Sequence, residues 1–252
     1  LYVASHHHHP TTVTLSAARR VRLLELAQQY GKGDSPESLG LSTADLMARA
    51  GKYKEALPLY AEMLELDPSP VIVGRYYNTL MADGRPDEAI KWLQEWVAAH
   101  GSDTESKMLL ALGFLQRGKM DEAAAHYKEL TTIVPANPVP WNNLAWIYGQ
   151  QGRDDALDVA KETYERASKS ALVADTYAWL LFKQGNIADS SEILKRAYVT
   201  VTKNPEIVYH YAAVLNAQGK TEEAIKLLEK AIASKDNFAE RDEAKALLQR
   251  LR

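Results

Sequence analysis

Cysteine is absent from the 252-residue chain, and long apolar runs are absent as well. Without cysteine the chain has no disulfides and no thiolate metal sites, which fits a reducing cytosol and a periplasm equally well. The longest apolar run, Met108 to Leu115, is far shorter than the roughly 18–20 residues that cross a bilayer. Because the N-terminus has no charged segment followed by an apolar one, we expect any signal peptide to lie outside this chain.

Charge of one sign is also lacking. The formal net charge is -3, and the acidic and basic residues are interspersed along the chain. Nucleic-acid partners and membrane surfaces call for clusters of Lys and Arg. We therefore expect no nucleic-acid partner and no membrane span.

Motifs of catalysis are missing too. The chain has no phosphate-binding glycine loop, no HExxH and no G-x-S-x-G. The run Ser5 to Pro10 contains four adjacent histidines and is typical of a purification tag, so we assign 1–15 to a tag or an extended N-terminal segment. Beyond that run only His100, His126 and His210 remain, at different positions relative to the repeats described below. We expect no enzyme activity, no cofactor and no metal site.

What the chain does have is a glycine at a regular interval. Apolar helical patterns end at glycines spaced 33 or 34 residues apart, and a small residue stands seven positions before five of the six. An acidic turn and an alanine follow most of them, as in "GRPDEAIKWL", which predicts the start of a second helix. The glycines are Gly51, Gly84, Gly118, Gly152, Gly185 and Gly219.

A helix–turn–helix unit of 34 residues with these features resembles the tetratricopeptide repeat. The resemblance implies an all-α fold, a right-handed superhelix or α-solenoid of about six repeats. Two repeats depart from the pattern, since Ala156 follows its glycine one position early and Ser190 replaces the alanine. The expected parts are an N-terminal helix or partial repeat at 16–36, repeats at 37–69, 70–103, 104–137, 138–170, 171–204 and 205–238, and a capping helix at 239–252.

The last third carries a narrower resemblance. The stretches "NNLAWIYGQQGRDDAL", "DTYAWLLFKQGN" and "YHYAAVLNAQGK" are similar to the C-terminal part of large bacterial tetratricopeptide proteins associated with exopolysaccharide and exosortase (PEP-CTERM) systems. This resemblance implies a periplasmic or cell-envelope setting, and the cytoplasm is the alternative.

The first helices of such repeats line a concave face in the family that the chain resembles. Trp146 and Trp179 both stand six residues before a turn glycine. We expect both indoles to be partly exposed in one groove as recognition residues, the alternative being that they fill space between helices. Since no lysine stands ten residues before a turn glycine, a clamp for a peptide carboxylate is not expected. The predicted ligand groove consists of Asn78, Met108, Leu112, Gln116, Asn142, Trp146, Gln150, Asp175, Trp179, Lys183, Tyr209 and Asn216.

Three functions fit this pattern. The first is a non-enzymatic scaffold or adaptor that binds a protein segment in the concave groove, in bacterial envelope or exopolysaccharide export assembly. The second is an envelope factor whose groove contacts a polysaccharide directly. The third is a structural spacer or self-association module.

Overall fold

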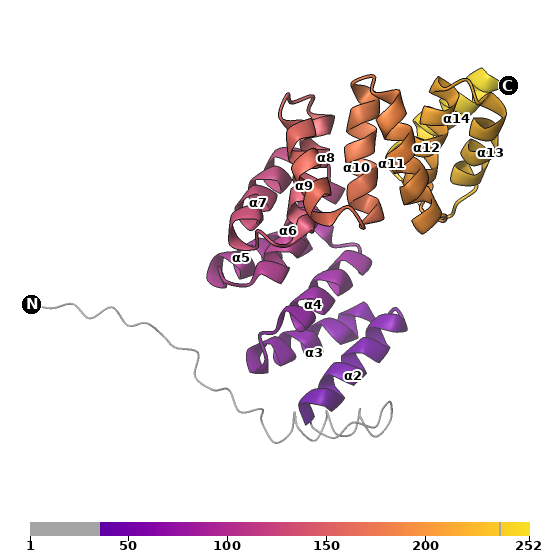
Figure 1. Cartoon of the computed structure of the whole chain (residues 1–252). Coiled ribbons are helices and arrows are strands. Elements are labelled where there is room, and N and C mark those ends of the chain that lie inside the picture. Colours follow the sequence, from indigo (N-terminus) through magenta and orange to yellow (C-terminus); the bar gives the residue numbers. More distant parts are fainter. Residues whose placement is uncertain (1–35, 237) are drawn as a thin grey trace, which may run out of the picture. The chain divides into compact units, whose positions relative to one another are not determined.

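The structure is a computed structural model that describes residues 36–236 and 238–252. Within these residues all regular structure is α-helical, and no β-strand is present, which confirms the predicted fold class. The expected N-terminal helix at 16–36 and the histidine run lie outside the described residues, apart from the first residue of α2. Figure 1 labels the helices, which are α2 (Pro36–Arg49), α3 (Tyr53–Leu66), α4 (Pro70–Ala82), α5 (Pro86–Ala99), α6 (Thr104–Gln116), α7 (Met120–Ile133), α8 (Pro138–Gln150), α9 (Ala156–Ala167), α10 (Ala171–Lys183), α11 (Ile187–Thr200), α12 (Pro205–Ala217), α13 (Thr221–Ile232) and α14 (Arg241–Leu251).

The turn glycines end the first helix of each pair. Gly84 has a φ of 75°, a left-handed conformation that is strained for residues with a Cβ. Its N–H donates to the carbonyl of Met81, and the N–H of Arg85 donates to the carbonyl of Leu80. This pair of bonds is the Schellman motif, and it recurs at the other five glycines, where φ is also positive. The periodic glycines therefore stop each first helix and turn the chain back along it.

Small residues allow the two helices of a pair to approach closely. Ala145 on α8 and Ala178 on α10 have no exposed surface. Ser190, which departs from the repeat pattern, is also fully buried on α11. Its hydroxyl donates to the carbonyl of Ala178 at 2.7 Å, so the extra polar atom is satisfied. A serine can therefore replace the expected alanine at this helix contact.

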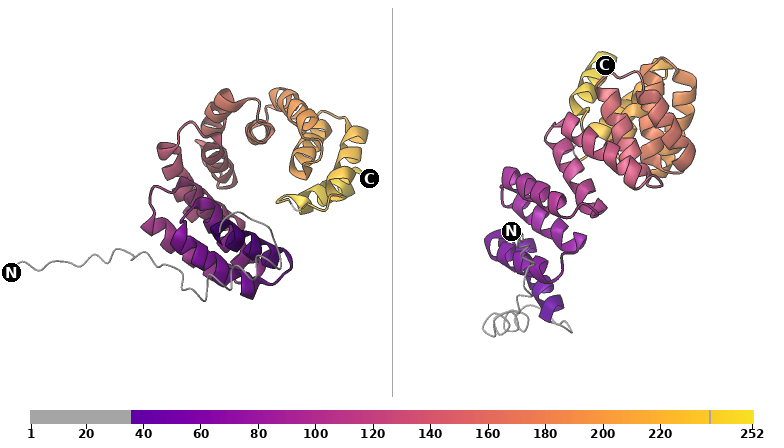
Figure 2. Two further views of the ribbon diagram at one scale, coloured as in Figure 1. Left: turned by 90° about the horizontal axis from the view of Figure 1, so that it is seen from below. Right: turned by 90° about the vertical axis from the view of Figure 1, so that its left-hand side faces the viewer.

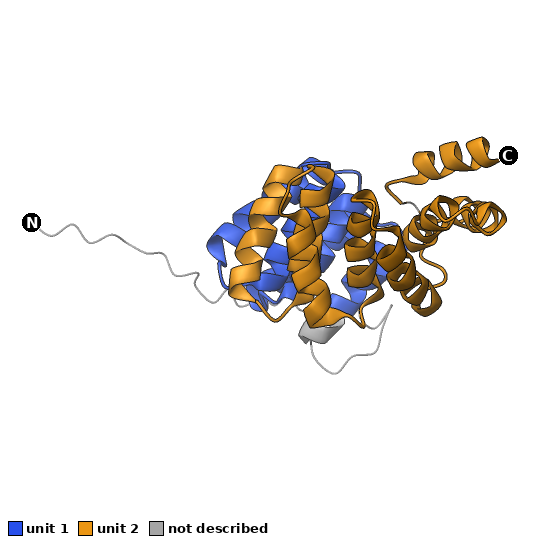
Figure 3. Cartoon of the chain, turned by 45° about the horizontal axis from the view of Figure 1, so that its top comes forward, with its two compact units in different colours: residues 1–119 blue, residues 120–252 orange. Residues whose placement is uncertain are grey.

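The chain divides into two compact units, one ending at Lys119 and the other running from Met120 to Arg252 (Figure 3). Consecutive helices of the second unit pack against each other from α7 to α14 (Figure 2). In addition α8 contacts α10, α10 contacts α12 and α12 contacts α14. The first helices of successive repeats thus lie side by side in this unit, and α14 follows them as the last member of the row. The boundaries assigned to the individual repeats stay a prediction.

Candidate functional site

The predicted groove residues all lie on first helices of the repeats. Asn78 is on α4, and α6 carries three of the residues; these belong to the first unit. The other eight are on α8, α10 and α12 of the second unit. Nine of the twelve side chains are exposed or half-buried, whereas three are buried: Asp175, Trp179 and Tyr209. The binding role of the twelve residues stays a prediction.

Four of the predicted residues meet at one place in the second unit, which we call the Trp slot. Trp146 and Gln150 come from α8, and Trp179 and Lys183 come from α10. The Lys183 ammonium lies 5.4 Å from the centre of the Trp179 ring, a cation–π distance. The cavity between these side chains measures about 10 Å³, which is close to the smallest space that holds one water molecule. The Trp slot is therefore a narrow crevice.

The two tryptophans differ in exposure. Trp146 is half-buried, as expected. Trp179 is only 7% exposed, so the expectation that both indoles are partly exposed is wrong for Trp179. Its ring stacks on His210 of α12, with centroids 4.0 Å apart and planes 15° apart, and packs in one hydrophobic cluster with Phe238. Helix α12 and the segment before α14 thus cover the Trp179 indole, which its own repeat alone would leave exposed.

Beneath Trp179 lies a buried cluster of charged groups. His210 is 1% exposed, and its Nδ1 lies 2.9 and 3.0 Å from the two oxygens of Asp175. Because a carboxylate only accepts hydrogen bonds, Nδ1 carries the proton and donates. On the other side, Nε2 of His210 lies 3.6 Å from Oε1 of Glu240, too far for a hydrogen bond. Glu206 stands one helical turn before His210 and completes what we call the His210 cluster, which consists of Asp175, Glu206, His210 and Glu240.

The ionisable groups of this cluster shift one another's pKa values. Burial alone would lower the pKa of His210, but the neighbouring Asp175 and Glu240 raise it to about 10. Burial raises the pKa of Glu206 to about 7, and the Asp175 and Glu240 carboxylates add to this effect against the opposing influence of His210. For Glu240, burial would raise the pKa, but His210 outweighs it and the pKa lies below its usual range. At neutral pH the imidazole is thus a cation held among carboxylates.

Sequence reasoning missed the His210 cluster. His210 was treated as isolated because its repeat position differs from those of His100 and His126. Two signals point to the cluster in hindsight. Glu206 and His210 are four residues apart and so share one face of a helix, and Asp175 stands one repeat earlier at almost the same position relative to its turn glycine.

The first unit has a separate hollow of about 460 Å³. Asp45 and Arg49 of α2 and Arg75 and Asn78 of α4 line it. Asp45 forms an ion pair with Arg75 and accepts a hydrogen bond of 2.6 Å from the hydroxyl of Tyr60. Of the predicted groove residues, Asn78 lies here. Acidic and basic side chains line the hollow, and Asp45 is already ion-paired with Arg75.

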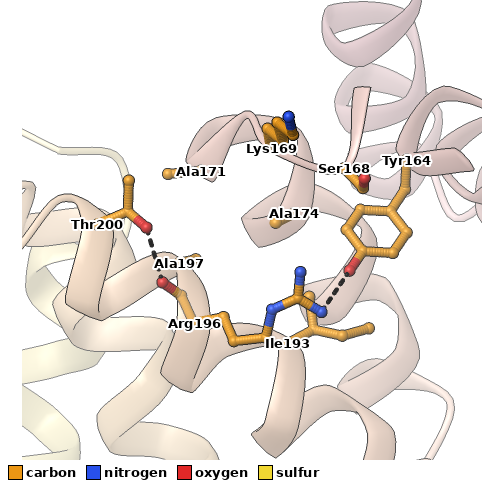
Figure 4. Close-up of a pocket in the computed structure, with 9 residues that line it drawn as sticks. All are labelled: Tyr164, Ser168, Lys169, Ala171, Ala174, Ile193, Arg196, Ala197 and Thr200. Carbon is orange, nitrogen blue, oxygen red and sulfur yellow. Dashed lines mark hydrogen bonds between the residues drawn. The ribbon is translucent and has the colours of Figure 1, made fainter. Parts of the chain in front are cut away.

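A third hollow, of about 240 Å³, lies among α9, α10 and α11 (Figure 4). Nη1 of Arg196 donates to the hydroxyl of Tyr164 at 3.5 Å, and Figure 4 shows the two side chains meeting across the hollow. Lys169 and Thr200 stand at its rim. None of the predicted groove residues lines it, and its cationic side chains are exposed to solvent.

Helix length bears on membrane association. No helix in the described part of the chain combines the length and the apolar character needed to cross a bilayer.

Comparisons with known proteins agree on the fold. The tetratricopeptide repeat family model matches residues 47–113 and 181–251, more than half of the chain. The cytochrome c-type biogenesis protein CycH of Rhizobium meliloti (strain 1021) is 33% identical over 105 residues, a stretch that covers 40% of this chain and 27% of that protein. The chain thus matches about a quarter of the length of this curated relative.

Two solved structures resemble this chain over most of its length. A tetratricopeptide repeat protein from Parabacteroides merdae has a TM-score of 0.64 at 15% identity, over 93% of this chain and 91% of that one. A chain of the APC/C hetero-tetramer Cut9–Hcn1 has a TM-score of 0.67 at 15% identity, over 93% of this chain and 46% of that one. At such identities the likeness concerns the fold alone. Taken with the repeated glycine turns and the matched family model, it shows that the chain belongs to the tetratricopeptide repeat family.

Proposed function

We propose that the chain is a non-enzymatic scaffold that binds an extended protein segment along the first helices of its second unit. Members of the tetratricopeptide repeat family generally act as scaffolds that bind protein partners. The observation that carries the proposal is the Trp slot, where a half-buried indole, an exposed amide and an exposed ammonium stand together on adjacent first helices. Each of these groups suits a peptide, because indoles anchor side chains while amides and ammonium groups bond to backbone carbonyls.

Trp146 is the anchor that we assign within this site. Part of the Trp146 ring is exposed to water in the free chain, and a partner that covers it buries this apolar surface. Tryptophans of this kind often dominate the binding energy of an interface. Trp179 supports it from below, since it is buried against His210 and borders the same slot. Lys183 places a positive charge beside the slot, which favours a segment with an acidic residue near its apolar anchor.

The test is the Trp146→Ala variant, compared with the intact chain for binding of peptides selected from a random linear library. We expect the substitution to weaken binding by about 2 kcal/mol, or roughly 30-fold, because it removes the anchor but little of the core. Fluorescence polarisation of labelled peptides measures the affinities. Trp92→Ala is the matched control, since Trp92 is also a half-buried tryptophan and lies on α5, a second helix of the first unit.

Other outcomes separate the alternatives. Binding of cellohexaose or chitohexaose in place of peptides would favour a polysaccharide-contacting factor. Equal affinities for the Trp146→Ala variant and the intact chain would remove Trp146 from the site. A chain that selects no peptide and binds no sugar would favour a spacer or self-association module.

A finer assignment follows from the match to CycH. The 105 matched residues favour a role in c-type cytochrome biogenesis. A cell-envelope setting, including exopolysaccharide export, is the other proposal, and it rests on the resemblance of the last third of the chain. Haem staining of c-type cytochromes after deletion of the gene distinguishes the two, since only the first requires that these cytochromes be lost.

A further inference from the structure

Two buried polar atoms of the His210 cluster lack a hydrogen bond. Nε2 of His210 and Oε2 of Glu240 are both buried and lack a partner within the described residues. An unpaired buried polar atom normally costs about 1–3 kcal/mol, so such atoms need an explanation. Glu206 adds a carboxylate, and one ligand atom from each of the three residues lies within 4.8 Å of the other two.

The charges of the cluster are unbalanced. Three carboxylates, from Asp175, Glu206 and Glu240, surround a single imidazole. Even a fully protonated His210 leaves more negative than positive charge around two buried residues, Asp175 and His210, where unpaired charge is costly. Lys183 and Arg241 are the neighbouring cations, but Lys183 is exposed. Arg241 directs its guanidinium to the carbonyls of Ile232, Ser234 and Asp236. A bound cation would balance the charge better than a proton does.

We propose that Glu206, His210 and Glu240 bind one divalent transition-metal cation, for which Zn²⁺ is the best match. Nε2 of His210 and one oxygen of each glutamate are the ligands, and a water molecule completes a four-coordinate site. Binding requires neutral imidazole, so the Nε2 proton leaves to solvent as the metal enters. The separation of 3.6 Å between Nε2 and Glu240 already approaches the spacing of two ligands on one zinc ion.

Asp175 acts in this site as a positioning residue. It accepts the Nδ1 proton of His210 and so leaves Nε2 free and directed at Glu240. A carboxylate that holds a histidine in this way fixes the ring and its tautomer and increases the basicity of the ligand nitrogen. The buried imidazole also selects the metal, because nitrogen ligands suit Zn²⁺ and its neighbours better than Ca²⁺ or Mg²⁺.

Such a cation joins two elements of the C-terminal end. Glu206 and His210 belong to α12, whereas Glu240 is the residue that precedes α14. The cation would thus hold the start of α14 against α12 and raise the melting temperature of the chain.

The test is a Zn²⁺ titration against a chromophoric chelator, using the full chain with His6–His9 replaced by serine, because that run binds metals by itself. We expect one equivalent of Zn²⁺ per chain, a rise in melting temperature with Zn²⁺ but not with Ca²⁺ or Mg²⁺, and Co²⁺ absorption bands of a four-coordinate site. Glu240→Gln and Glu206→Gln should each weaken binding at least tenfold. Asp175→Asn should weaken it about 10–100-fold.

Glu243→Gln is the matched control, since Glu243 is an exposed carboxylate on α14 and should leave Zn²⁺ affinity unchanged. Circular dichroism of each variant shows whether it is folded, and Co²⁺ spectra of the chain with intact ligands need no variant in the cluster. An absence of saturable Zn²⁺ binding, or equal binding by the Glu206→Gln, Glu240→Gln and Glu243→Gln chains, would overturn the site and leave a buried ion cluster alone.

Discussion

Replacing Trp179 with alanine should lower the free energy of unfolding by about 3–5 kcal/mol, the usual cost of deleting a buried large aromatic side chain. Its indole is 7% exposed. It stacks on His210, and it packs in one cluster with Tyr209 and Phe238. Its removal opens a cavity that these neighbours fill only in part. Urea unfolding followed by circular dichroism at 222 nm measures the change.

Trp146→Ala provides the comparison within the same chain. Trp146 is half-buried and borders the same slot, so its loss removes less buried surface and should cost clearly less stability. The two tryptophans thus have separate roles, one in stability and one in binding. Equal losses for both variants would mean that Trp179 is no more a core residue than Trp146.

Replacing Asp175 with alanine in metal-free buffer should lower the free energy of unfolding by about 3–5 kcal/mol, because it breaks a buried ion pair and leaves the partner uncompensated. The partner is His210, whose Nδ1 lies 2.9 Å from one oxygen of the carboxylate and 3.0 Å from the other. The remaining neighbour, Glu240, is 3.6 Å from the opposite ring nitrogen. Urea unfolding in the presence of EDTA gives the difference.

Two further variants serve as comparisons for Asp175→Ala. Asp175→Asn should cost less, because the amide oxygen can still accept the Nδ1 proton even though the charge is gone. Asp158→Ala removes an exposed carboxylate from the first turn of α9 and should cost less than about 1 kcal/mol. A loss at Asp175 no greater than that at Asp158 would show that the buried pair contributes nothing measurable.

The fold could be predicted from local features of the sequence. Each turn glycine adopts a positive φ that depends only on the residues next to it in the chain. The helices on either side of it are predicted by patterns within 34 residues. The exposure of the groove residues could not be predicted in the same way. Trp146 and Trp179 hold equivalent positions in their repeats, but His210 covers Trp179. That difference depends on the next repeat, which supplies His210 and ends at Phe238.

Sequence analysis missed the His210 cluster for a related reason. Asp175 and His210 are 35 residues apart, and Glu240 belongs to the segment after the last repeat. The periodic pattern describes how residues of one repeat face their neighbours, but it assigns no meaning to a residue type that does not recur at one position of the repeat. A single histidine among carboxylates becomes visible only when α10, α12 and the start of α14 are placed together.

The contacts of His210 also bear on how the chain comes apart. In a solenoid, stability is close to a sum of terms for single repeats and for the interfaces between neighbours, so weak interfaces let the ends fray one repeat at a time. Asp175, His210 and Glu240 connect three successive members of the row in the second unit, α10, α12 and the start of α14. His210 interacts with charged residues on both sides, Asp175 and Glu240, so partial opening is costly. Releasing α14 would remove Glu240 from His210, while α10 and α12 still hold the imidazole in place. We therefore expect the C-terminal helices to open together rather than one repeat at a time, and the buried face of Trp179 to stay covered until they do.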